Sequence, residues 1–176
     1  MSLEKWDIYD SSGNITGKTI LRGKCLLKPG EYHLVVHIWI VSSDGMFIIQ
    51  RRSDTKKLMP GEWAATGGAA MSGEDSYTAA NRELFEELGI KTDRNTLSFL
   101  TRLKRRNSFL DIYATTYDKD IEQLKLQKSE VSETKLVTKS RLKQMIENKE
   151  FHNYGKEYFD TVFNKVEEYV AGGVTV

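Results

Sequence analysis

The chain contains few of the residues that build disulfide frameworks, flexible linkers or nucleic-acid-binding surfaces. Among 176 residues there is one cysteine, Cys25, so neither an intramolecular disulfide nor a thiolate zinc cluster is expected. Prolines occur only at Pro29 and Pro60, and no low-complexity stretch or internal repeat interrupts the sequence. The formal net charge of +1 does not provide the basic field typical of nucleic-acid-binding proteins. We therefore predict one domain over residues 1–176 and no nucleic-acid partner.

Long apolar runs are also missing. No run approaches the roughly 20 residues that a membrane-spanning helix needs. Residues 1–10 are polar and acidic, which is not typical of a secretory signal. We expect a reducing, cytoplasmic setting and no membrane partner. Apolar residues make up 39% of the chain and charged residues 29%, a composition that predicts a globular protein with a sizeable core.

The hydrophobic patterns predict a mixture of strands and helices. Strands are expected over residues 33–40 and 46–51, joined by an Asp44-Gly45 turn, and over residues 97–104 and 108–117. Helices are expected over 74–88, 140–148 and 154–170, the second with Ser140 as its N-cap. Shorter strands are expected at 6–9, 18–21, 62–66 and 135–137, the first two within a short N-terminal β extension of about residues 1–30. Because strands and helices do not alternate regularly, we predict a mixed α/β fold with helices packed on a mixed sheet.

The predicted helix over 74–88 carries a dense acidic face. At about 100° per residue, Glu83, Glu86 and Glu87 fall within one sector of the helix. Like charges at this spacing repel one another, and a hard divalent cation such as Mg²⁺, or Mn²⁺ in its place, would remove that cost. The alternative is an ordinary solvated acidic face, so the surrounding sequence decides between the two interpretations.

That surrounding sequence is highly specific. Gly68 is followed after five residues by Glu74, and after seven more by Arg82-Glu83, the start of a segment that ends at Gly89-Ile90. Residues 68–90 resemble the Nudix box of the Nudix hydrolase superfamily at every specified position. The resemblance implies an α/β/α sandwich with a loop–helix–loop catalytic motif.

The resemblance also implies roles for individual residues. Glu83, Glu86 and Glu87 become ligands of Mg²⁺, Arg82 and Glu74 orient them, and the leading glycines allow close approach of the backbone. These roles predict a metal-dependent hydrolase that cleaves a diphosphate bond in a nucleoside diphosphate derivative or a similar organic diphosphate. Relatives often take a further ligand or a general base from the region that here contains Glu130 and Glu133, although a solvated acidic turn is the alternative for either residue. Many relatives are dimers, so a homodimer is a further expectation.

A second resemblance extends beyond the box. Residues 6–10, 32–34, 50–53 and 60–63 look like the isopentenyl-diphosphate isomerase-like branch of the superfamily, in which a basic segment after the second strand binds the substrate's diphosphate. Arginine and lysine suit phosphate oxygens, so we predict phosphate contacts from this segment, unless it is simply an exposed basic loop. The candidates are Arg51, Arg52, Lys56 and Lys57, together with the glycines Gly67 and Gly68.

Two rival functions follow from these resemblances. Isopentenyl-diphosphate isomerisation requires a cysteine, and a metal-binding histidine two residues later, at places that here hold Gly67 and Ala69. A non-catalytic nucleotide-binding regulator would be expected to lose the glutamates, which are all present. Hydrolysis is therefore favoured over both. His33 and His37 share one side of their predicted strand and are interpreted as hydrogen-bonded structural residues.

Overall fold

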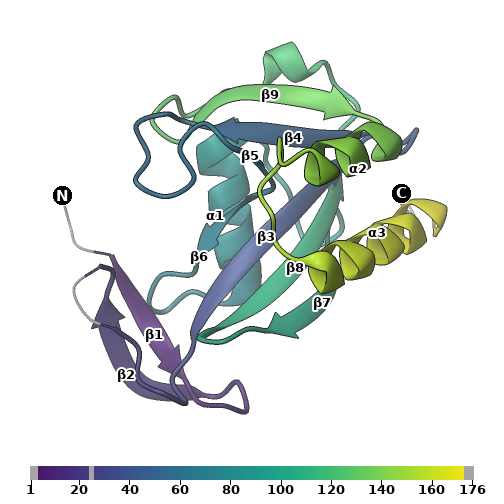
Figure 1. Cartoon of the computed structure of the whole chain (residues 1–176). Helices are drawn as coiled ribbons and strands as arrows, with labels where there is room; N and C mark the ends of the chain where they lie inside the picture. Colours follow the sequence, from purple (N-terminus) through teal and green to yellow (C-terminus); the bar gives the residue numbers. More distant parts are fainter. Residues whose placement is uncertain (1–3, 24–25, 173–176) are drawn as a thin grey trace.

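The computed structural model describes residues 4–23 and 26–172, so Cys25 lies outside the described residues. A mixed seven-stranded sheet is covered by helix α1 (Ser76–Leu88) on one face and by helices α2 (Lys139–Glu147) and α3 (Lys156–Ala171) on the other (Figure 1). This arrangement confirms the predicted α/β/α fold. In the described residues no helix is long and apolar enough to cross a membrane.

The main sheet follows the order β5-β4-β3-β8-β7, with β6 paired to β3 and β9 paired to β4. Strands β3 and β8 run parallel over their whole lengths, from His33 opposite Ser108 to Val41 opposite Thr116. The other strand pairs of this sheet are antiparallel. The hairpin predicted around Asp44-Gly45 is confirmed, and the strands predicted at 97–104 and 108–117 pair with each other. The bounds are β3 His33–Val41, β4 Phe47–Arg52, β5 Trp63–Ala64, β6 Thr66–Ala69, β7 Leu97–Lys104, β8 Ser108–Thr116 and β9 Val131–Val137. Strand β9 thus begins earlier than the predicted residues 135–137, because its pairing with β4 extends to Arg52.

Strand β3 is buried on both faces and separates two parts of the core. Val36 and Ile38 point to the α1 side, whereas Trp39 points to the side covered by α2 and α3. A run of β-branched and aromatic residues without polar alternation is typical of such a central strand. Trp39 is 1% exposed and therefore lies in the core.

Helix α1 (Ser76–Leu88) is fixed by its caps and by an apolar stripe. The Asp75 carboxylate accepts a hydrogen bond from the Thr78 N–H, and Gly89 closes the helix in a left-handed conformation with φ of 71°. Leu84 and Leu88 are buried against the sheet, which stabilises the fold by about 1.5–3 kcal/mol for each side chain. The predicted helix and its glycine cap are therefore confirmed.

The opposite face is covered by α2 (Lys139–Glu147) and α3 (Lys156–Ala171), and a short 3₁₀ turn, η1, spans Ile121–Gln123. The prediction that Ser140 caps α2 is wrong. Thr138 is the N-cap, because its backbone is extended and its hydroxyl accepts from the Arg141 N–H at 3.2 Å. Both residues have side chains suited to a cap, so the sequence alone did not distinguish them.

The N-terminal extension forms a separate hairpin of β1 (Lys5–Tyr9) and β2 (Ile15–Leu21). This hairpin folds beside the start of β3 and the loop before α1 (Figure 1). Asp7 fastens it there, because its carboxylate accepts hydrogen bonds from the Ser72 hydroxyl at 2.7 Å and the Gly73 N–H at 2.8 Å. The hairpin therefore contributes to the region around the acidic face of α1.

Candidate active site

A cavity of about 730 Å³ lies along the acidic face of α1. Helix α1 and strands β3 and β6 line one part of it, and the N-terminal hairpin, the end of β4 with the loop after it, and the segment before β9 line the rest. Carboxylates and cations face each other across it. The charged lining residues are Glu4, Arg22, Arg52, Lys56, Arg82, Glu83, Glu86, Glu87 and Glu130.

The three predicted metal ligands all line this cavity but differ in their environments. The Glu86 side chain is 46% exposed and that of Glu83 only 15%. Glu87 as a residue is 3% exposed. Helical spacing thus brings the three carboxylates to one wall while placing them at different depths. Their role as metal ligands stays a prediction.

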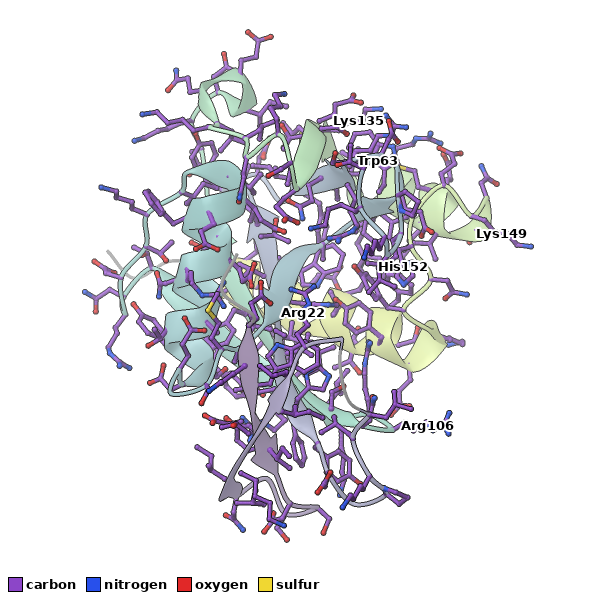
Figure 2. The ribbon with its side chains drawn as sticks, turned by 90° about the vertical axis from the view of Figure 1, so that its left-hand side faces the viewer. Arg22, Trp63, Arg106, Lys135, Lys149 and His152 are labelled. Atoms are coloured by element: carbon purple, nitrogen blue, oxygen red, sulfur yellow. The ribbon has the colours of Figure 1, made fainter. Side chains whose placement is uncertain are left out.

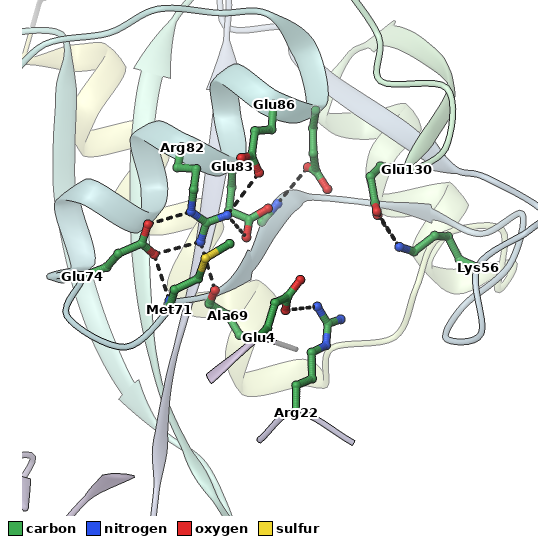
Figure 3. A network of polar contacts seen from close by, with 12 residues as sticks. Glu4, Arg22, Lys56, Ala69, Met71, Glu74, Arg82, Glu83, Glu86 and Glu130 are labelled. Atoms are coloured by element: carbon green, nitrogen blue, oxygen red, sulfur yellow. Dashed lines mark hydrogen bonds and ion pairs between the residues drawn. The ribbon is translucent and has the colours of Figure 1, made fainter. Parts of the chain in front are cut away.

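Arg82 organises this wall (Figure 3). Its guanidinium binds Glu74 through Nε at 2.7 Å and Nη2 at 2.9 Å, and Nη2 also donates to the Ala69 carbonyl oxygen at 3.2 Å. Nη1 donates to Glu83 at 2.9 Å and to Glu86 at 3.2 Å. A guanidinium has five N–H groups, and all five have an acceptor here. Arg82 and Glu74 therefore lie where residues that orient the acidic face are expected.

Two glycines allow the carboxylates to approach the backbone of β6. A Cβ on Gly68 would stand 2.3 Å from Oε1 of Glu83, and a Cβ on Gly67 would stand 2.1 Å from the Val36 carbonyl oxygen. A Cβ on Gly67 would therefore clash with backbone, and a Cβ on Gly68 would force the Glu83 carboxylate to move. A glutamate of α1 makes the close approach at Gly68 here, and the approach of a ligand to these glycines stays a prediction.

Glu87 is a buried carboxylate that forms no ion pair with any residue in the described part of the chain. Its Oε2 accepts hydrogen bonds from the Gln50 amide at 2.8 Å and the Gly67 N–H at 3.3 Å. Burial, followed by the nearby charge of Glu83, raises the pKa of Glu87 from 4.5 to about 8. Sequence reasoning did not identify Gln50 as a partner of Glu87. The available signal was a glutamine at the end of the apolar run Phe47–Ile49, a polar group that requires a partner when buried.

These residues fit a divalent cation by their chemistry. Carboxylate oxygens are the ligands that Mg²⁺ prefers, and a cation bound here would place a positive charge beside the Glu87 carboxylate. Within residues 4–23 and 26–172, no three carboxylate, imidazole or thiol groups stand close enough together to hold an ion as they are placed. The geometry gives the reason, since Arg82 holds the carboxylates of Glu83 and Glu86. Cation binding would require these two side chains to turn away from Arg82.

The predicted phosphate contacts divide into two groups. Arg52 and Lys56 line the cavity, and Lys56 donates to Glu130 at 2.6 Å across from α1 (Figure 3). Arg51 does not line it, because its Nε donates to the Gly61 carbonyl oxygen at 3.0 Å. Alternate residues of a strand point to opposite sides, which explains why only one arginine of the pair reaches the cavity. Lys57 and Glu133 are not among the lining residues either.

The contribution of the N-terminal hairpin was missed by sequence reasoning. Trp6 and Arg22 line the cavity, and Trp6 stacks on His33 with ring centroids 4.3 Å apart. Arg22 lies near the middle of the view in Figure 2, whereas Arg106, one of four basic residues between positions 102 and 106, extends outward. Arg102, another of these four, is paired with the buried Asp111 at 2.5 Å. No local pattern marks the hairpin as part of a site, because it is brought there by contacts between distant segments, such as those of Asp7 with the loop before α1 and the backbone hydrogen bonds between Tyr9 and Tyr32.

Comparison with known proteins agrees with this geometry. The NUDIX domain profile matches residues 31–159, so the chain belongs to the Nudix family. A Nudix hydrolase of Listeria monocytogenes is 37% identical over 153 residues, which cover 86% of this chain and 90% of that protein. The crystal structure of a Deinococcus radiodurans protein, DR0079, superimposes with a TM-score of 0.72 at 27% identity, covering 82% of this chain and 90% of the other. The Nudix domain of Shewanella oneidensis NrtR, solved with ADP-ribose, shares the fold at a TM-score of 0.51 and 16% identity over 63% of this chain and 75% of its own.

Proposed function

We propose that this Nudix protein is a Mg²⁺-dependent hydrolase that cleaves the diphosphate bond of a nucleoside diphosphate derivative or a similar organic diphosphate. The observation that carries the proposal is the lining of one cavity by three carboxylates of α1 and, facing them, Arg22, Arg52 and Lys56. A diphosphate carries several negative charges, so its binding next to carboxylates requires both a cation and basic side chains. A Nudix domain of the same fold was solved with ADP-ribose, a compound of this chemical class.

The roles of the chain's own residues follow from their positions. Glu83, Glu86 and Glu87 would hold the cation, which when bound stabilises negative charge on the phosphates and lowers the pKa of an attacking water. Arg52 and Lys56 contact phosphate oxygens. Glu130 lines the cavity from outside α1, and Lys56 fixes the position of its carboxylate, so Glu130 is our candidate for accepting the proton of the water.

The rival isomerase function lacks its chemical groups. The places of its cysteine and histidine correspond to Gly67 and Ala69 of β6, which line the cavity but bear no titratable side chain. Proton transfer to and from a prenyl double bond requires such groups. We therefore propose hydrolysis.

A phosphate-release screen with and without Mg²⁺ tests the proposal. It includes nucleotide sugars, dinucleoside polyphosphates, nucleoside triphosphates, coenzyme derivatives and prenyl diphosphates. Glu86→Gln is the diagnostic variant, because its exposed side chain permits the change without disturbing the core. Glu157→Gln, on α3 and outside the cavity, is the matched control. We expect turnover to fall at least about 100-fold in the first variant and to be unchanged in the second. Isomerised prenyl product without phosphate release would instead support the isomerase.

A further inference from the structure

His37 lies beside the proposed cation-binding site but belongs neither to the acidic face of α1 nor to the basic residues that line the cavity. It is on β3, is 9% exposed, and lines the same cavity as Gly67 and Glu87. Its ring packs between Tyr154, with centroids 4.7 Å apart, and Tyr158, with centroids 5.6 Å apart. Because buried polar atoms are normally hydrogen-bonded, each nitrogen atom of this imidazole should have a hydrogen-bond partner.

The hydrogen bonds of Tyr158 determine the tautomer of His37. The Tyr158 hydroxyl oxygen lies 3.0 Å from Trp39 Nε1 and 2.8 Å from His37 Nδ1. An indole N–H is only a donor, so the hydroxyl accepts from Trp39. Among the described residues the hydroxyl has no third partner, so the only acceptor for its own proton is His37 Nδ1. Leaving that proton unpaired in the core would be costly, so Tyr158 donates to Nδ1 of His37.

It follows that the imidazole carries its proton on Nε2. Burial lowers the pKa of His37 to about 3, so the ring is neutral and has one N–H group. Since Nδ1 accepts from Tyr158, that group is Nε2–H. The chain Trp39, Tyr158, His37 thus sets the direction of the remaining donor.

Nε2 remains accessible from the cavity. Within the described residues it makes no hydrogen bond, and it is also absent from the fully buried polar atoms without a partner, which are Trp6 Nε1, His33 Nδ1 and Thr115 Oγ1. The neighbouring ring carbon, Cδ2, lies 3.0 Å from the place where a Cβ on Gly67 would stand. The missing side chain of Gly67 therefore leaves open the side of the ring that bears Nε2.

We propose that His37 is a substrate-binding residue whose Nε2–H donates a hydrogen bond to a phosphate oxygen of the diphosphate, and that Tyr158 and Trp39 are positioning residues for it. This inference rests on the proposed function for the nature of the ligand. Phosphate oxygens are the acceptors expected there, because His37 shares the cavity edge with Gly67, whose N–H holds Glu87. A neutral donor suits this place, since a second cation would compete with the bound metal.

Imidazole nitrogen spectroscopy tests the tautomer and the contact directly. The chain has three histidines, so a protein labelled with ¹⁵N-histidine gives a simple spectrum. His33→Gln and His152→Gln assign the signals. His37 should show a protonated Nε2 and an unprotonated Nδ1. Its Nε2 signal should shift when Mg²⁺ is added in excess together with methylenediphosphonate, a diphosphate analogue that is not hydrolysed. The signal of His152, which pairs with Glu62 outside the cavity, should not shift.

Kinetics of matched variants supply the second readout. His37→Phe keeps a ring but removes the donor, and we expect kcat/KM to fall roughly 10- to 100-fold, as for loss of a hydrogen bond to a charged group. Tyr158→Phe should show a smaller loss and a mixture of tautomers at His37. Tyr154→Phe removes a hydroxyl from the same aromatic cluster but leaves in place the hydrogen bonds that join Trp39, Tyr158 and His37. This variant should retain both the tautomer and the rate.

Two results would overturn the inference: a His37 proton on Nδ1, or an unmoved Nε2 signal with the analogue in excess. Failure of the proposed function is seen separately, as absence of turnover. A protein that binds the analogue through His37 without hydrolysing any diphosphate would keep this inference and refute the hydrolase.

Discussion

Replacement of Glu87 by glutamine should make the metal-free protein more stable while abolishing its activity. Both hydrogen bonds to Glu87 end on one oxygen, Oε2, so an amide oxygen in its place keeps the bonds from Gln50 and Gly67. What disappears is a negative charge in a site that is 3% exposed. A buried, unpaired charge is unfavourable, and the amide removes it without changing the size of the side chain.

The magnitude follows from the pKa of Glu87, which rises from 4.5 to about 8 on folding. Because the folded protein binds this proton more tightly, the associated stability is fully present below pH 4.5 and is lost as the pH rises through 8. Each pKa unit corresponds to about 1.4 kcal/mol, so the loss above pH 8 is on the order of 3–5 kcal/mol. For a chain of this size the variant should gain roughly 6–20 °C in Tm at high pH.

Thermal unfolding in EDTA between pH 5 and pH 9 measures this effect. The gap between Glu87→Gln and wild type should widen as the pH rises, whereas Glu86→Gln, altered at an exposed side chain, should follow the wild-type trend. Added Mg²⁺ should raise the Tm of the wild type at pH 8 more than that of Glu87→Gln. A Glu87→Gln protein no more stable than wild type at pH 8 in EDTA would show that the buried charge is already compensated, and the reasoning would fail.

Three further predictions concern the walls of the cavity. Arg82→Lys should lower kcat at least about 10-fold and reduce the Tm in thermal denaturation scans, because the three N–H groups of lysine cannot replace the five of arginine. An unchanged rate would contradict the orienting role of Arg82. Gly68→Ala should weaken Mg²⁺ binding in calorimetry about 10-fold or more, because its Cβ would stand 2.3 Å from the Glu83 carboxylate; wild-type affinity would contradict it. Arg22→Ala should raise KM about 3- to 30-fold in steady-state assays with little change in kcat. Arg51→Ala, which alters a residue outside the cavity, should leave KM close to wild type. Equal effects of the two substitutions would argue against substrate binding by the hairpin.

The parts of the site that were predictable are those fixed by local spacing. Helix α1, its glycine cap and the common face of Glu83, Glu86 and Glu87 follow from helical periodicity, and the main strands follow from apolar runs bounded by turns. The contact of Arg82 with Glu86 is also local, because the two residues are one helical turn apart.

The remaining parts depend on contacts between segments far apart in the chain. Gln50 meets Glu87 across 37 positions, and Asp7 reaches Ser72 across 65. No periodicity or motif encodes such pairs, so the depth of Glu87 and the entry of Trp6 and Arg22 into the cavity were not predicted. Arg51 and Arg52 show the same limit on a smaller scale, because the sequence places them together and the strand separates them.

Because of the Asp7 contact, we expect residues 31–159, which match the NUDIX domain, to be insufficient as a folding unit in this protein. A fragment restricted to residues 31–159 would lose the hairpin whose Asp7 binds the loop before α1, and with it one side of the cavity along α1. It would also end within α3, before Val162 and Val166, which are buried against the opposite face of the sheet. Any shortened version for crystallisation or engineering should therefore retain both flanks, since one completes the cavity beside α1 and the other closes the core.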